Sequence, residues 1–170
     1  PLGSLRMHLL TGWNKKDVGA NAFYSPRYPE QYENTEVTFA ALKINGISSL
    51  PLTRASLYWR GHRDHFMLYR NHPEYYQNHH YNQSAGTRLE TGIRSKAGIT
   101  TTSLDFRYES IRSTSLGQPL SSPTPVSGTE SIRYTNQDAR IHLTISANHR
   151  ISRNNIQISG GMMLHHTLQP

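Results

Sequence analysis

Apolar and polar residues alternate with a period of two along much of this chain, which is the pattern of β-strands with two unlike faces. In the stretch SLDFRYES, Leu104, Phe106 and Tyr108 alternate with polar residues, and EVTFAALK places Val37 and Phe39 on one face. No helical period of useful length competes with this pattern. The alternation predicts seven strands, near residues 6–16, 35–44, 47–70, 81–96, 99–112, 131–149 and 155–168.

The segments between these strands are long and short in turn. The long ones read DVGANAFYSPRYPEQYEN, NHPEYYQNHH and STSLGQPLSSPTPVSGTE, and the short ones NG, KAG and ISRNN. The pair NG, flanked by Ile44 and Ile47, is a strong signal for a two-residue hairpin turn. Alternate connections of a meander lie at the same end, so the sequence predicts an all-β, antiparallel, up-and-down meander of about seven long strands. Its long loops lie at one end and its tight turns at the other, as in bacterial outer-membrane barrels.

The predicted strands are also longer than the ~5–6 residues of an average soluble strand. About 9 to 11 tilted residues are needed to cross the hydrocarbon layer of a membrane. A soluble β-sandwich with long loops is the alternative. It has to explain strands of this length with so few large aliphatic residues on their inward faces.

Composition favours interfaces over a dry core. The chain has 170 residues, which suits one domain, yet only 35% of them are hydrophobic and the mean hydropathy is -0.67. Ten Tyr outnumber 4 Phe and 2 Trp. The net charge of +7 is compatible with nucleic acid or anionic lipid. However, the 18 Lys and Arg are scattered and no recognition helix carries them, so we expect no nucleic-acid partner.

Several kinds of chemistry are disfavoured by what the sequence lacks. With no cysteine, the chain has no disulfide scaffold, thiol nucleophile or thiolate zinc site. It contains no G-x-S-x-G, Walker loop or H-E-x-x-H motif, and we expect neither an enzyme nor a cofactor. No apolar run of the length of a transmembrane helix is present. Residues 1–4, PLGS, resemble the scar of a removed expression tag, so we expect the domain itself to span 5–170.

Four stretches of the chain resemble the barrel of TonB-dependent outer-membrane receptors. They are GANAFYSPRYPEQYENTEVTFAAL, YWRGHRDHFMLYR, FRYESIRSTSLGQP and YTNQDARIHLTISANHRISRNNIQISGG. The chain is most similar to the cobalamin-receptor-like branch, in which a Tyr-Trp-Arg-x-His-x-Asp-x-Phe strand precedes a loop with Tyr and His. A Phe-Arg-x-Glu-x-Ile-x-Ser-x-x-Leu-Gly-x-Pro hairpin top follows there, and Phe106 to Pro119 match it. Ser110 departs from the usual family Gly. The resemblance covers nearly all of residues 5 to 168.

This resemblance implies a slice of a barrel of ~22 strands, without the plug domain and TonB box. The parent protein would import a scarce large nutrient across a Gram-negative outer membrane, a corrinoid or else an iron siderophore or haem. Implied partners are outer-membrane lipid or detergent, the nutrient, a surface-exposed lipoprotein, and TonB through the missing plug. The open edges of such a slice also predict an edge-to-edge oligomer. The alternative is a soluble, secreted β-domain that binds a protein or glycan through its Tyr-rich loops.

Two groups of side chains are candidates for function. Rigid aromatic residues suit contact with a ligand, although an aromatic girdle at the membrane interface explains each of them equally well. The loop candidates for ligand or partner contact are Tyr24, Arg27, Tyr28, Tyr32, Tyr75, Tyr76, His79 and His80. Arg60, His62 and Asp64 share one face of the strand YWRGHRDHFMLYR, and we interpret them as a polar hydrogen-bond cluster facing the lumen. The 10 histidines do not suggest three or four converging ligands, so no metal site is expected.

Overall fold

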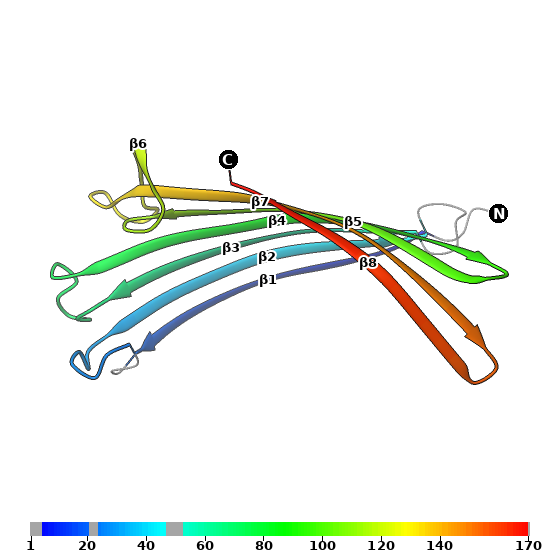
Figure 1. The fold of residues 1–170 in the computed structure, drawn as a ribbon. Coiled ribbons are helices and arrows are strands. Elements are labelled where there is room, and N and C mark those ends of the chain that lie inside the picture. Colours follow the sequence, from blue (N-terminus) through cyan, green and yellow to red (C-terminus); the bar gives the residue numbers. More distant parts are fainter. Residues whose placement is uncertain (1–4, 21–23, 47–52, 170) are drawn as a thin grey trace.

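The computed structural model describes residues 5–20, 24–46 and 53–169, and these residues form one antiparallel sheet (Figure 1). The predicted all-β meander is confirmed. Within the described part of the chain, no helix is long and apolar enough to cross a membrane. The strands are β1 (Arg6–Gly19), β2 (Tyr32–Asn45), β3 (Arg54–Met67), β4 (Gln77–Ser95), β5 (Gly98–Ser113), β6 (Gln118–Pro125), β7 (Arg133–Arg153) and β8 (Ile156–Leu168).

Strand order follows the sequence with one exception. Each strand from β1 to β5 pairs with the next, and β7 then pairs with β5. β6 pairs with the first residues of β7, up to Gln137, while β8 pairs with Ile141 to Arg153 of the same strand. β6 and β8 therefore share β7 without contacting the same part of it (Figure 1).

The short strand β6 was not predicted from the sequence. Its residues belong to the segment STSLGQPLSSPTPVSGTE, which the sequence pattern assigns to a loop. Pro119 pairs with Asn136 and Pro125 with Arg133, and the register is irregular between these two points. Proline lacks an N–H group and is therefore tolerated on an edge strand, where one side of the backbone needs no partner. The frequency of proline here hid a real but short edge strand.

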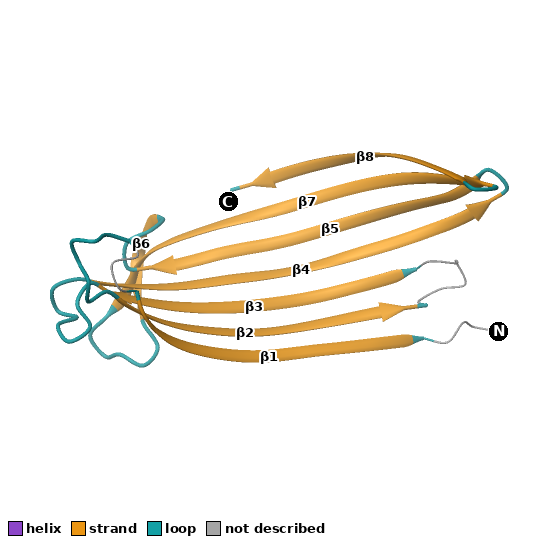
Figure 2. Cartoon of the chain, turned by 90° about the horizontal axis from the view of Figure 1, so that it is seen from below, coloured by secondary structure: helices purple, strands orange, loops and turns teal. Residues whose placement is uncertain are grey.

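Long connections gather at one end of the sheet, as predicted (Figure 2). Residues 24–31, 68–76 and 114–132 lie at this loop end, and β6 lies within the last of these segments. The connections 96–97 and 154–155 are tight turns at the opposite end. Asn154 has a φ of 51°, a left-handed conformation that Asn tolerates better than most residues. The sheet thus has a loop end and a turn end.

The NG pair does not form the predicted two-residue turn. Asn45 is still paired, with Arg54, and Gly46 N–H donates to the Thr53 carbonyl at 3.0 Å. The connection therefore runs from residue 46 to residue 53, and residues 47–52 lie outside the described part. Gly46 has a φ of 78°, so this glycine ends the strand rather than forming the centre of a tight hairpin.

Several other strand boundaries differ from the prediction, and two of them flank the loop between β3 and β4. β3 ends at Met67, so Leu68, Tyr69 and Arg70 belong to the loop rather than to a strand reaching residue 70. β4 begins at Gln77, four positions before the predicted residue 81. The Leu68 N–H donates to the Tyr76 carbonyl at 3.1 Å, which closes the loop just beyond the last paired residues.

The sheet has two chemically different faces. Side chains alternate along each strand and directly paired residues point to the same side, so the register assigns every strand residue to one face. We call one the apolar face. Its exposed apolar side chains are Met7, Leu9, Trp13, Leu57, Trp59, Leu89, Ile93, Leu104, Phe106, Tyr108, Leu143, Ile145, Ile151, Ile158, Met162, Leu164 and Leu168.

The opposite side is the polar face. It carries Arg60, His62, Asp64, Asn82, Ser84, Arg107, Glu109, Asp138, Arg140 and His142. Two of its aromatic residues lie over glycines: a Cβ atom on Gly12 would collide with the Phe39 ring. A Cβ atom on Gly86 would lie 2.5 Å from the Tyr58 hydroxyl. These glycines let large rings lie flat across the neighbouring strand.

Burial is concentrated at the loop end. Val126 and Tyr134 are the large apolar side chains buried within the described residues, and Ser113 at the end of β5 is fully buried. The rest of the sheet is a single layer with both faces open, so most of its apolar side chains remain exposed. A soluble protein rarely leaves an apolar surface of this extent uncovered.

Candidate functional site

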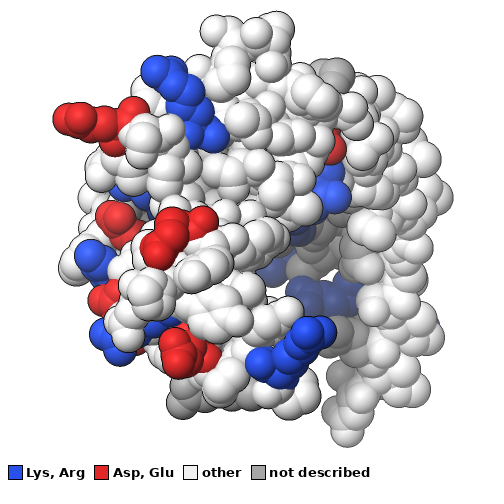
Figure 3. Space-filling model, turned by 90° about the vertical axis from the view of Figure 1, so that its left-hand side faces the viewer, with Lys and Arg blue, Asp and Glu red and all other residues white. Residues whose placement is uncertain are grey.

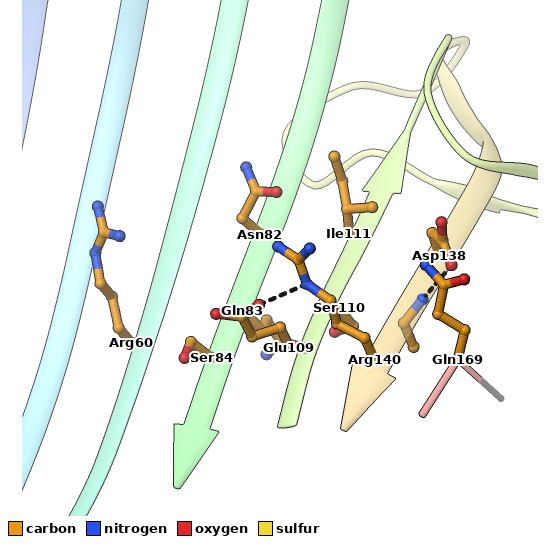
Figure 4. Close-up of a pocket in the computed structure, with 11 residues that line it drawn as sticks. Arg60, Asn82, Gln83, Ser84, Glu109, Ser110, Ile111, Asp138, Arg140 and Gln169 are labelled. Carbon is orange, nitrogen blue, oxygen red and sulfur yellow. Dashed lines mark hydrogen bonds and ion pairs between the residues drawn. The ribbon is translucent and has the colours of Figure 1, made fainter. Parts of the chain in front are cut away.

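The polar face carries a hollow lined by strands β3, β4, β5 and β7 (Figure 4). Its volume is about 390 Å³, and Arg60 and Glu109 are among the side chains that line it. Arg140 donates from Nε to a Glu109 carboxylate oxygen at 2.7 Å, and Arg107 Nε lies 3.4 Å from the other oxygen. His142 Nε2 lies 3.3 Å from Glu109 as well. Glu109 is therefore the charged centre of this hollow. The sequence did not reveal this role, because the partners of Glu109 come from two different strands.

The predicted trio Arg60, His62 and Asp64 does lie on the polar face of β3. Among the described residues, however, no hydrogen bond joins any two of these three side chains. Arg60 lines the same hollow as Glu109, at its β3 side. Asp64 lies farther toward the loop end and interacts with Glu33 of β2. The common face is correct, whereas the mutual hydrogen bonds of the predicted cluster are not formed.

Asp64 and Glu33 form a pair of carboxyl groups near the loop end. Burial, together with the charge and the hydrogen-bonding side chain of Glu33, raises the pKa of Asp64 to about 6. Asp64 Oδ1 is buried and has no hydrogen-bond partner among the described residues. The Tyr24 hydroxyl donates to Glu33 at 3.3 Å. One predicted loop tyrosine therefore contacts the same carboxyl pair.

Four of the five predicted loop tyrosines belong to two ring clusters. Tyr69 connects the first, with its ring centroid 6.1 Å from that of Tyr28 and 5.9 Å from that of Tyr75. Phe66 connects the second, at 5.5 Å from Tyr24 and 6.5 Å from Tyr76. Both clusters bridge the loop before β2 and the loop before β4. The connecting residues Tyr69 and Phe66 were missed because the sequence pattern placed them inside a strand.

Arginines lie against the rings of this loop end. The Arg27 guanidinium lies 5.8 Å from the Tyr28 ring centroid, and Arg70 lies 4.4 Å from that of Tyr32. Tyr32 is the first residue of β2, whereas Tyr24, Tyr75 and Tyr76 lie in the loops. The last three expose 58%, 72% and 49% of their surface. The loop end therefore offers accessible aromatic surface, with basic and acidic side chains interspersed around it (Figure 3).

His79 and His80 are not loop residues, in contrast to the prediction. Both belong to β4 and point to opposite faces. His79 is only 7% exposed and stacks on His65, so it offers little surface to a ligand. Burial, together with the neighbouring His65 and His80, lowers the pKa of His79 to about 4. These two histidines contact side chains of the neighbouring strands β3 and β5, and they do not line a binding site.

Asp64, His80 and Ser113 form a row across β3, β4 and β5. His80 Nδ1 and Ser113 Oγ are 2.8 Å apart, which resembles the base and nucleophile of a hydrolase. Ser113 is fully buried, however, and its Oγ accepts from the N–H groups of Ser115 and Leu116 at 2.9 and 2.7 Å. A hydroxyl used in this way shapes the turn after β5 and is not available to attack a substrate.

No three His, Asp or Glu residues of the described segments gather closely enough to hold a metal ion. His165 and His166 illustrate why, since neighbours on a strand point to opposite faces. His165 instead stacks near His142 at 5.5 Å and bonds Thr144 and Thr167.

The chain was compared with protein families, with curated proteins and with solved structures. No family model matches it, and neither does any curated protein or solved structure.

Proposed function

We propose that this chain is a section of the wall of an outer-membrane β-barrel, of the TonB-dependent receptor type. The observation that carries the proposal is the apolar face, where exposed apolar side chains extend over β1, β3, β4, β5, β7 and β8, while Leu42 and Ile44 of β2 lie half-buried between them. The polar face behind it carries charged and hydroxyl side chains. Alternation of lipid-facing apolar and lumen-facing polar residues is the signature of transmembrane barrels.

The height of the apolar face supports the same proposal. On β4 this face runs from Gln83 through Ala85, Thr87 and Leu89 to Ile93. Ten steps of ~3.3 Å give about 33 Å along the strand, and a tilt of ~40° reduces this to about 25 Å. That height equals the apolar band of outer-membrane barrels. Trp59 and Tyr108 lie near its loop-side boundary, where aromatic girdles occur.

The unpaired edges of the sheet support the proposal that it is part of a larger barrel wall. Within the described sheet, β1 pairs only with β2, and β8 only with β7. Exposed edges present unpaired N–H and C=O groups that bind further strands. In the proposed barrel these edges continue into more wall, and the polar face becomes the lumen lining.

The cargo we propose is a scarce large nutrient, a corrinoid or else an iron siderophore or haem. The motif resemblance is the basis of this choice, and the exposed Tyr24, Tyr75 and Tyr76 supply loop surface that suits such a ligand. In the intact receptor, replacing Tyr24, Tyr28, Tyr32, Tyr75 and Tyr76 together by Ala is expected to reduce uptake. Unchanged uptake and unchanged binding of surface partners would remove the contact role from these residues.

A soluble domain that binds a protein or glycan through the same tyrosines is the second candidate. Fluorescence quenching of the two tryptophans separates it from the first. Trp13 and Trp59 are both exposed on the apolar face. The chain, folded into vesicles of phosphatidylcholine brominated on its acyl chains, should lose much of its tryptophan emission.

Brominated lipid quenches only within contact distance, so a domain outside the bilayer keeps its emission. A Leu9→Trp variant on the apolar face and a Leu10→Trp variant on the polar face, each without the native tryptophans, provide a matched pair. Strong quenching is expected only at position 9. Equal quenching at both positions, or none, would contradict the assignment of the faces.

A further inference from the structure

A row of charged and aromatic residues crosses the apolar face on the loop side of its apolar band. Direct pairing aligns its members over six strands, from β1 to β7. We call it the charged row, and its residues are Lys15, Glu36, Arg63, Tyr81, Arg112 and Gln137. With three cations and one carboxylate it has a net positive charge.

Arg63 and Arg112 lie on either side of Tyr81 in this row. Two strand spacings of ~4.8 Å place their Cα atoms about 10 Å apart, a separation that two extended arginine side chains can close on one phosphate group. Arg63 lies over the Tyr81 ring at 5.5 Å from its centroid. Its ion pair with Glu36 is long, 3.5 Å through one nitrogen, and half-exposed. Arg112 is exposed and makes no hydrogen bond or ion pair with a described residue.

An apolar groove begins on the turn-end side of these two arginines. Its floor on β4 is formed by the small residues Ala85 and Thr87. Trp59 of β3 and Tyr108 of β5 flank the floor, and the groove has a volume of about 460 Å³. Leu57 and Phe106 continue the two sides toward the turn end, and Leu9, Ala40 and Leu42 widen the groove toward β1.

Gly61 joins the groove to the charged row. A Cβ atom at Gly61 would lie 3.0 Å from the Trp59 ring and 3.3 Å from the Tyr81 hydroxyl, so both side chains meet over this glycine. Tyr81 also accepts a hydrogen bond from Gln83 at 2.8 Å. The cationic end and the apolar groove therefore form one continuous surface.

We infer that this surface binds an anionic, phosphate-bearing lipid of the membrane leaflet at the loop end. The phosphate lies between Arg63 and Arg112, and one acyl chain lies in the groove along β4. This inference rests on the proposed function, because only a barrel wall presents the groove to lipid. A cationic group next to an apolar surface suits an anionic lipid, because the cation binds the headgroup and the apolar surface contacts the acyl chain. Arginine is suited to phosphate because it donates two parallel hydrogen bonds.

Quenching of a single tryptophan tests the inference. In a Trp13→Phe variant, Trp59 is the remaining tryptophan and lines the groove. This variant is folded into vesicles that contain brominated phosphatidic acid or brominated phosphatidylcholine at equal mole fraction. We expect brominated phosphatidic acid to quench Trp59 at a severalfold lower mole fraction than phosphatidylcholine does.

Charge substitutions assign the preference to the two arginines. Arg63→Gln with Arg112→Gln should make the two lipids equal. Arg60→Gln with Arg107→Gln removes the same charge from the same two strands on the polar face and should leave the preference intact. A preference that survives the first pair, or disappears with the second, overturns the inference.

Two further outcomes keep this inference distinct from the proposed function. Quenching by phosphatidylcholine without any preference for phosphatidic acid retains the barrel wall and refutes the lipid site. Absence of quenching by either lipid refutes both. Inorganic phosphate, added at the concentration of the lipid phosphate, should leave the preference unchanged, and its abolition by phosphate would identify a site for free phosphate instead.

Discussion

The imidazole rings of His65 and His79 stack across the β3–β4 pair with their centroids 3.8 Å apart. Nε2 of each ring also lies near the same Gln77 side-chain oxygen, at 2.9 Å for His65 and 3.2 Å for His79. Both residues lie on the loop side of the charged row, beyond the apolar band. Burial of His79, together with the neighbouring His65 and His80, disfavours a charge on the His79 ring, because that charge is poorly solvated there.

Protonation of His79 should therefore open the loop ends of β3 and β4. Its pKa in the fold, about 4, is below the ordinary value of 6.5, so the unfolded segment binds the proton more tightly. The stabilisation is present above pH 6.5 and is lost as the pH falls toward 4. Amide hydrogen exchange of residues 63–67 and 77–81 measures it. His79→Gln should remove most of this pH dependence, and an unchanged slope in the variant would contradict the assignment.

Asp64 should show the opposite pH dependence. Its pKa is raised to about 6 in the fold from an ordinary 3.8, so the fold favours the neutral acid. The stabilisation is present below pH 3.8 and is lost as the pH rises through about 6. Asp64→Asn should accordingly exceed the wild-type chain in stability at pH 8 and equal it at pH 4. Denaturant unfolding in detergent at both pH values measures the difference.

Glu33→Gln provides the companion experiment to Asp64→Asn. Either change removes the carboxylate repulsion, so the double variant should gain less than the sum of the two single gains. Additive gains would show that the two carboxyl groups do not interact.

Gly12 should tolerate a side chain only when Phe39 is made smaller. The three atoms nearest to the position that a Cβ would take at this glycine all belong to the Phe39 ring. Gly12→Ala should cost about 1–3 kcal/mol, the usual effect of overpacking, and should cost little in a Phe39→Ala background. Gly86→Ala serves as the contrast, because the Phe106 backbone oxygen would remain 2.7 Å away after any change at Tyr58. Unfolding in detergent of single and double variants gives the coupling energies.

Neighbouring residues of β5 should differ in how much stability a positive charge costs. Leu104 lies on the apolar face near its middle and Ser103 on the polar face. Leu104→Arg is expected to cost ~2–4 kcal/mol of stability in a bilayer, as charges do on the lipid side of a barrel. Ser103→Arg should cost less than about 1 kcal/mol, by the same comparison. Equal costs at the two positions would argue for a soluble sheet.

Periodicity predicted most of this architecture because strand alternation is local information. Leu104, Phe106 and Tyr108 do share a face, and so do Val37 and Phe39, although the latter pair lies on the polar face over Gly12. The pattern alone does not distinguish which apolar set meets solvent or lipid. That distinction requires the register of all neighbouring strands.

Features that depend on distant residues were not predicted. Asp64 meets Glu33 diagonally across a pair of strands, and no motif marks such a contact. The charged row depends on the exact pairing of six strands, which alternation leaves free to shift by two residues. Tyr69 was read as a strand residue because an aromatic run gives no signal where pairing ends and a loop begins. Phe66 does lie in β3, but its ring contacts with Tyr24 and Tyr76 depend on residues far away in the sequence.

The single-layer sheet has a consequence for how its parts depend on one another. Among the described strands, β3 pairs with β2 and β4, and β5 pairs with β4 and β7. Thermodynamic coupling therefore passes from strand to strand in one dimension, as in repeat proteins, and decays with each step. A substitution in β1 should alter β2 strongly and β7 hardly at all. Side chains in one hairpin of such a sheet can therefore change without disturbing the other hairpins, which leaves each loop free to diverge on its own.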